Sequence, residues 1–123
     1  MSVNRETARK AMDELLNQRD LTALDRHFAE NYIQHNPAIA DGREGLRVIV
    51  PTLPDDFRYT VLRTFEDGDH VIALARVSGF LPEGDAAVAD VFRFENGRIA
   101  EHWDILQPYV PDDQTASGNP MLS

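Results

Sequence analysis

The chain contains no cysteine, which excludes disulfide bridges and thiolate metal sites. Basic residues are few: 12 lysines and arginines stand against 21 acidic residues, and the formal net charge is −9. This balance argues against nucleic acid and anionic membrane surfaces as partners, because both attract basic patches. Residues 1–16 lack the apolar core of a signal peptide, and no segment has the about 20 apolar residues of a transmembrane helix. We therefore expect a cytoplasmic protein that binds neither nucleic acid nor membrane.

Motifs of covalent and cofactor chemistry are also missing. The sequence has no glycine-rich phosphate loop and no Gly-x-Ser-x-Gly nucleophile turn. The histidines His27, His35 and His102, with Asp90 and Asp104, are possible metal ligands, but no two histidines have the helical spacing of a metal site. We therefore expect no cofactor and no metal.

Apolar residues in the first half of the chain recur at helical spacing. They predict helices over residues 4–17, 21–28 and 42–50. Between the second and third helix, Pro37 disfavours helical backbone at the residue before it, so residues 32–37 are predicted to be extended.

The second half changes to the alternating pattern of strands. Turn sequences at 66–69, 82–85 and 96–97 separate four predicted strands, over residues 57–65, 70–79, 86–95 and 98–107. Helices followed by antiparallel strands predict an α+β fold with the helices on one side of a curved sheet. The hollow side of such a sheet commonly hosts a ligand. We expect one domain over residues 1–110 and an extended or flexible tail over residues 111–123.

The most informative motif is His102-Trp103-Asp104 on the last predicted strand. Residues two apart on a strand share a face, so His102 and Asp104 point one way and Trp103 the other. A carboxylate and an imidazole on one face can exchange protons, and burial raises the pKa of a carboxylate toward neutrality. The same pattern also fits a histidine and an aspartate facing solvent while Trp103 fills the core.

Asp90, on the preceding strand, joins this motif in only one hairpin register. A two-residue turn at Asn96-Gly97 places Asp90 opposite Trp103, whereas a three-residue loop places it opposite His102. Asn-Gly suits both turns, and a slip of one residue exchanges the two faces of a strand. Its apolar neighbour Phe92 is a candidate substrate-binding residue.

The segment YIQHNP, residues 32–37, is the third motif. The turn at Asn36-Pro37 would hold Tyr32 and His35 at the mouth of the hollow, where both are candidate substrate-binding residues. A solvated loop histidine is the alternative for His35.

Two of these motifs together, YIQHNP and DVFRFENGRIAEHWDILQP, with the helix entry DGREG between them, resemble the SnoaL-like polyketide cyclases. That family belongs to the superfamily that shares the fold of nuclear transport factor 2. The resemblance spans nearly the whole chain and implies a conical sheet, a long helix across its open side, an apolar pocket and a homodimer formed through the sheet.

The family cyclases perform an intramolecular aldol condensation without cofactor or metal, and the resemblance implies matching roles here. Asp104 matches the acid/base aspartate on the last strand, and His102 matches the histidine two residues before it. Asp90 stands where the family has a second pocket histidine, so the sequence departs from the pattern there. The resemblance also favours the three-residue loop, which brings Asp90 to the pocket.

Three functions remain open at this point. The leading one is a cofactor-independent lyase or isomerase for a small apolar carbonyl compound, in which Asp104 removes a proton next to the carbonyl. His102 would relay that proton, and Tyr32 or His35 would donate a hydrogen bond to the enolate. Asp90 also leaves open a carboxylate-assisted isomerase or hydratase. The alternatives are a non-catalytic binding module for a hydrophobic small molecule and an interaction domain with an apolar outer sheet face.

Overall fold

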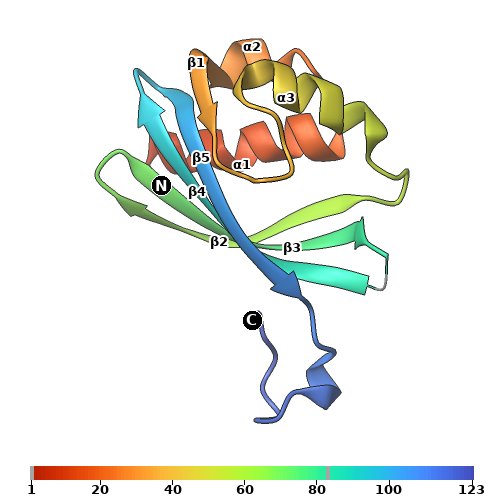
Figure 1. Ribbon diagram of the computed structural model, residues 1–123. Helices are drawn as coiled ribbons and strands as arrows, with labels where there is room; N and C mark the ends of the chain where they lie inside the picture. The colour runs from red at the N-terminus through yellow and green to blue at the C-terminus, as the bar shows by residue number, and fades with distance from the viewer. Residues whose placement is uncertain (1, 83) are drawn as a thin grey trace.

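A computed structural model describes residues 2–82 and 84–123 and shows an α+β fold, as the sequence predicts. Its helices are α1 (Val3–Met12), α2 (Ala23–His27) and α3 (Gly42–Ile49), with a π-helical turn at Asp13–Asn17 and 3-10 turns at Val50–Thr52 and Asp112–Gln114. Its strands are β1 (Phe28–Gln34), β2 (Arg58–Asp67), β3 (His70–Leu81), β4 (Gly84–Glu95) and β5 (Arg98–Pro108). The helices cover one side of the curved sheet (Figure 1). No helix among these residues is long and apolar enough to cross a membrane.

The sheet has the order β1-β5-β4-β3-β2 and is not closed. Strands β2 to β5 are antiparallel neighbours, as predicted, whereas β1 pairs in parallel with β5 at the edge and was not expected as a strand. Its register shifts between Phe28 and Ile33, so the burial of its side chains does not alternate. Because of this irregularity, the sequence lacks the alternation of apolar and polar residues that would predict a strand here. Of the predicted break at residues 82–85, Glu83 lies outside the described residues.

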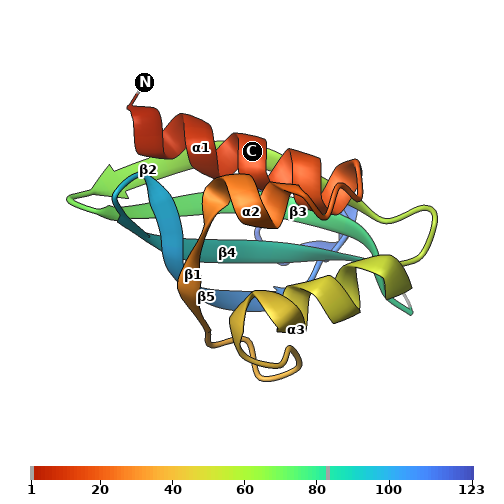
Figure 2. The same cartoon turned by 90° about the horizontal axis from the view of Figure 1, so that it is seen from above.

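Helix α1 lies across β2 and β3 on the concave face of the sheet (Figure 2). Ser2 caps it by accepting a hydrogen bond from the backbone N–H of Arg5 at 3.1 Å. Small side chains are buried on the helix and on the sheet beneath it: Ala8 and Ala11 on α1, and Ala73 and Ala75 on β3. The largest fully buried side chains are Phe28, Phe92, Leu15, Leu24, Ile99, Val50 and Val71.

The loop between β1 and α3 is packed tightly against α3. A Cβ atom on Gly45 would lie 1.7 Å from the carbonyl oxygen of Ala40, so this position requires glycine. The loop is tied at its other end as well, because the Asp41 carboxylate accepts a hydrogen bond from the backbone N–H of Gln34 at 2.9 Å. The loop therefore holds Asn36 in a defined place beside β5.

A bulge in β5 decides which residues face the concave side. The turn at Asn96-Gly97 has two residues, both with positive φ, so the three-residue loop predicted above is wrong. One extra residue on β5, Ala100, then shifts the register before the strand reaches the site. Beyond this bulge Asp90 pairs with Asp104, and both share a face with His102. The two-residue turn and the bulge together place Asp90, His102 and Asp104 on one face of the sheet, as expected.

The outer face of the sheet, away from the helices, carries apolar side chains in two neighbouring rows across β2 to β5. The first row is Phe65, Ile72, Val91 and Trp103, and the second is Leu74, Ala89 and Ile105, with Arg63 at its β2 end. Ile105 is 80% exposed and Phe65 is 52% exposed. Residues 109–123 follow β5 on this side of the molecule (Figure 1).

Candidate active site

A cavity of about 170 Å³ lies between the concave face of the sheet and the helices. Most of its wall is apolar and comes from α1 and the turn after it, β1 and the loop after it, α3, the segment leading into β2, and β3 to β5. The apolar lining residues are Met12, Leu15, Leu16, Phe28, Ala38, Ile39, Leu46, Ile49, Leu53, Phe57, Val77, Phe80, Ala86, Val88, Phe92 and Leu106. The polar ones are Tyr32, Gln34, Asn36, Tyr59, Asp90, His102 and Asp104.

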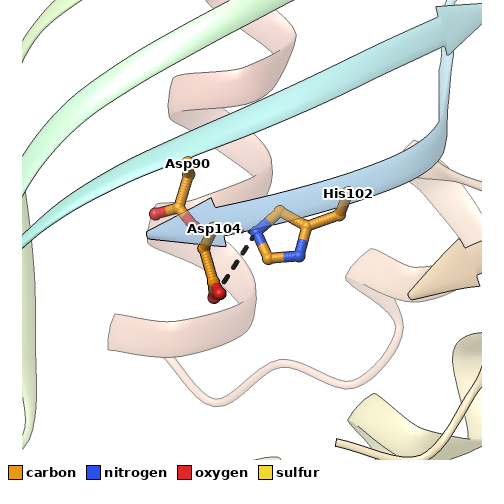
Figure 3. A group of neighbouring side chains, drawn as sticks. All are labelled: Asp90, His102 and Asp104. Carbon is orange, nitrogen blue, oxygen red and sulfur yellow. Dashed lines mark hydrogen bonds and ion pairs between the residues drawn. The ribbon is translucent and has the colours of Figure 1, made fainter. Parts of the chain in front are cut away.

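Three of the polar side chains point toward one another from β4 and β5 (Figure 3). His102 Nε2 lies 2.7 Å from Asp90 Oδ1 and 4.0 Å from Asp104 Oδ2. The side chains of His102 and Asp90 are 10% and 6% exposed, so water reaches this pair poorly. The first distance is a hydrogen bond and the second is not.

Hydrogen bonds fix where the protons of His102 lie. Its Nδ1 is 2.7 Å from Gln34 Oε1, and that oxygen also accepts the backbone N–H of Asn36 at 3.0 Å. Because an amide oxygen only accepts, Nδ1 carries a proton. A second proton must lie between Nε2 and Asp90 Oδ1 for these atoms to bond. The pair is therefore either an imidazolium with a carboxylate or an imidazole with a carboxylic acid.

Both oxygens of Asp90 already have hydrogen-bond partners. Its Oδ1 bonds to His102, and its Oδ2 accepts the hydroxyl of Tyr59 at 2.5 Å. Burial, and then the charge of Asp90, raise the pKa of Tyr59 well above its ordinary value, so Tyr59 remains a donor. Asp90 thus holds neighbouring groups in place.

Asp104, by contrast, keeps one oxygen available. Its Oδ2 accepts a hydrogen bond from Asn36 Nδ2 at 2.8 Å. Its Oδ1 accepts none from the part of the chain that the structure describes, and the side chain lines the cavity. Of the two carboxylates, Asp104 is the one with an oxygen that has no hydrogen-bond partner among the described residues.

Tyr32 offers a hydrogen-bond donor at the same wall. Its hydroxyl oxygen accepts from Gln34 Nε2 at 2.8 Å, while its own proton has no acceptor within residues 2–82 and 84–123. Burial, followed by the charges of Asp90 and Asp104, raises the pKa of Tyr32 far above its ordinary value. Tyr32 therefore keeps its proton for a ligand oxygen.

His35, a predicted substrate-binding residue, is not brought to the cavity. On β1 the side chain of Gln34 points into the cavity, so its neighbour His35 points to the outer face. There His35 Nε2 bonds to Glu101 at 2.6 Å, and its ring stacks on Trp103 with the centroids 4.9 Å apart. Phe92, in contrast, lies in the cavity wall, its ring 5.2 Å from that of His102.

Asp90, His102 and Asp104 also offer ligand atoms within 4.8 Å of one another, which is close enough to hold a metal ion. His102 Nε2 and both oxygens of Asp90 already form hydrogen bonds, so an ion would have to displace them. His27 is not part of this group, because it bonds to Glu14 at 2.9 Å.

Sequence reasoning missed Gln34, Asn36 and Tyr59. Gln34 follows Tyr32 by two residues on an extended segment, and that spacing alone places them on one face. Tyr59 offered no such signal, because it reaches Asp90 from β2, two strands away in the sheet.

Comparison with known proteins agrees with this architecture. A family model described as a SnoaL-like domain matches residues 8–102. No curated protein sequence matches the chain. Among solved structures, TsrD from Streptomyces laurentii is 25% identical, with a TM-score of 0.69 and coverage of 84% of this chain and 90% of that chain.

Two further structures have lower identity and support the fold alone. A protein from Acidithiobacillus ferrooxidans named as a polyketide cyclase is 20% identical, with a TM-score of 0.74 and coverage of 86% of this chain and 89% of that chain. A protein from Kribbella flavida named as a ketosteroid isomerase is 22% identical, with a TM-score of 0.73 and coverage of 89% and 82%.

Proposed function

Because the chain belongs to the SnoaL-like domain family, we propose that it is a cofactor-independent lyase or isomerase acting on a small apolar carbonyl compound. Family membership supports a role of the isomerase or cyclase kind, and the two structures that share the fold are named as a polyketide cyclase and a ketosteroid isomerase. The observation that carries the finer proposal is the free oxygen of Asp104 in an apolar cavity, beside a hydrogen-bonded histidine.

The proposed reaction begins with Asp104 as the general base. Its Oδ1 takes a proton from the carbon next to the carbonyl, the C–H electron pair forms the enolate, and the charge moves to the carbonyl oxygen. Tyr32 donates its hydroxyl hydrogen bond to that oxygen. The proton on Asp104 then returns to another carbon in an isomerisation. In an aldol step, the enolate carbon instead attacks a second carbonyl and the resulting alkoxide takes the proton.

The Asp90–His102 pair supports this step without touching the reacting carbon. His102 Nε2 lies 4.0 Å from Asp104 Oδ2, so the pair borders the proposed base without a hydrogen bond to it. Gln34 connects the pair to Tyr32, since it accepts from His102 and donates to the Tyr32 hydroxyl. The donor and the base are thus oriented by one hydrogen-bond network.

Deuterium exchange tests the proposal without knowledge of the natural substrate. The protein is incubated in D₂O with acetophenone derivatives, 1-indanone and 1-tetralone, and loss of the hydrogen next to the carbonyl is followed by NMR. We expect exchange about 10²–10⁴-fold faster than in buffer for a ketone that binds. Binding of these ketones at the buffer exchange rate would contradict the proposal and favour the non-catalytic binding module.

We further propose that two copies associate through the outer face of the sheet. The exposed side chains of the two rows are Phe65, Ile72 and Ile105, and an exposed apolar patch is typical of an interaction surface. Ile105→Arg introduces a charge into the patch at an 80% exposed site, so we expect it to convert a dimer into a folded monomer in light scattering. Val48→Arg, at a 69% exposed position of α3, serves as the matched control. A wild-type protein that is monomeric in solution would overturn this proposal.

A further inference from the structure

The cavity wall carries acidic side chains without a lysine or arginine among the described lining residues. The acidic side chains are the two aspartates, Asp90 and Asp104. The protein as a whole carries a formal net charge of −9, so its overall electrostatic field also disfavours the approach of an anion.

The two aspartates differ in how their charge is compensated. Asp90 has a proton between itself and His102, and the Tyr59 hydroxyl on its other oxygen. Asp104 has only the neutral amide of Asn36, and His102 Nε2 at 4.0 Å. In either protonation state the Asp90–His102 pair carries no net charge, so an anion that entered the cavity would meet the carboxylate of Asp104 with no net positive charge to offset it. Burying an unpaired anion in apolar surroundings is strongly unfavourable.

The donors and the volume set the other limits on the ligand. Tyr32 supplies one hydroxyl proton, which matches one carbonyl oxygen. The volume of about 170 Å³ exceeds by little the roughly 150 Å³ of an apolar cavity that takes up benzene. Phe80, 44% exposed, lines the cavity at its edge and gives it an apolar rim for the rest of the molecule.

We propose that this site selects uncharged carbonyl compounds of one to two rings and rejects carboxylates of the same shape, and that Asp104 sets this selection. The inference rests on the proposed function only for the identity of the reacting group, because selection by charge is a property of binding. A natural substrate that carried a free acid group would have to hold it outside the cavity, beyond Phe80.

Acetophenone and benzoate are nearly the same shape and differ in charge, so their affinities test the proposal directly. Titration calorimetry or ligand-observed NMR at neutral pH is expected to show acetophenone binding at least about tenfold more tightly than benzoate. The pair 2-acetylnaphthalene and 2-naphthoate repeats the comparison at two rings. Asp104→Asn is expected to shrink the difference by strengthening the binding of benzoate.

Asp67→Asn is the matched control, since it removes the same charge from an exposed position at the end of β2 and should leave the ratio unchanged. Equal affinity for ketone and carboxylate in the wild type, or binding of neither, would overturn the inference. An Asp104→Asn variant with the wild-type ratio would remove the role assigned to Asp104. Selective ketone binding without deuterium exchange would instead contradict the proposed reaction and leave the charge selection standing.

Discussion

Asp104→Asn is expected to slow deuterium exchange of a bound ketone about 10²–10⁴-fold, because the amide cannot take the proton that the carboxylate takes. The substitution preserves shape, and the asparagine Oδ1 can still accept the hydrogen bond that Asn36 donates at 2.8 Å in the wild type. Ketone binding and the melting temperature should therefore stay close to wild type. Loss of exchange is then a chemical effect rather than a structural one.

The measurement is the NMR exchange rate per bound ketone, with affinity determined separately for each variant. Asp67→Asn again controls for the lost charge, since Asp67 is exposed and lies outside the cavity lining. An Asp104→Asn protein that exchanges at the wild-type rate would show that another group is the base. The role of Asp104 in the reaction would then be withdrawn.

The residues of the last strand could be predicted from the sequence because strand alternation is a local property. His102 and Asp104 fall on one face and Trp103 on the other, as their spacing requires. The helical pattern of residues 4–17 was equally direct, and the structure continues α1 into a π-helical turn over the same span.

The place of Asp90 could not be predicted, because it depends on Ala100. A bulge is one extra residue in an otherwise regular strand, and an alanine between apolar and charged neighbours does not reveal it. The correct common face was therefore expected for the wrong reason, a three-residue loop. Only the structure shows which residues of β4 and β5 are paired.

Hydrogen-bond partners that lie far apart in the chain could not be predicted from the sequence either. Tyr59 contacts Asp90 across 31 positions of sequence, and Gln34 contacts His102 across 68. His35 directly follows Gln34 at the end of β1, and its contacts with Glu101 and Trp103 hold it on the outer face. Spacing predicts faces only within an element that has been recognised.

Asp90→Leu is expected to lower the free energy of unfolding by about 3–5 kcal/mol, the usual cost of removing one partner from a buried ion pair. Leucine leaves two buried groups without their acceptor, the Nε2 atom of His102 and the hydroxyl of Tyr59. Both residues are less than a tenth exposed, at 8% and 5%, so little water reaches the groups that lose their hydrogen bonds. Urea unfolding measures the change.

Asp90→Asn is the conservative comparison, since its amide oxygen still accepts from one neighbour and the loss should be smaller. The double variant Asp90→Leu with His102→Leu provides the sharper test, because it removes the orphaned imidazole together with its partner. We expect it to be less destabilised than the sum of the single changes, by about 0.5–3 kcal/mol. Strict additivity would contradict the coupling inferred from the 2.7 Å contact. If Asp90→Leu acts mainly on stability and Asp104→Asn mainly on exchange, one aspartate holds the network and the other performs the chemistry.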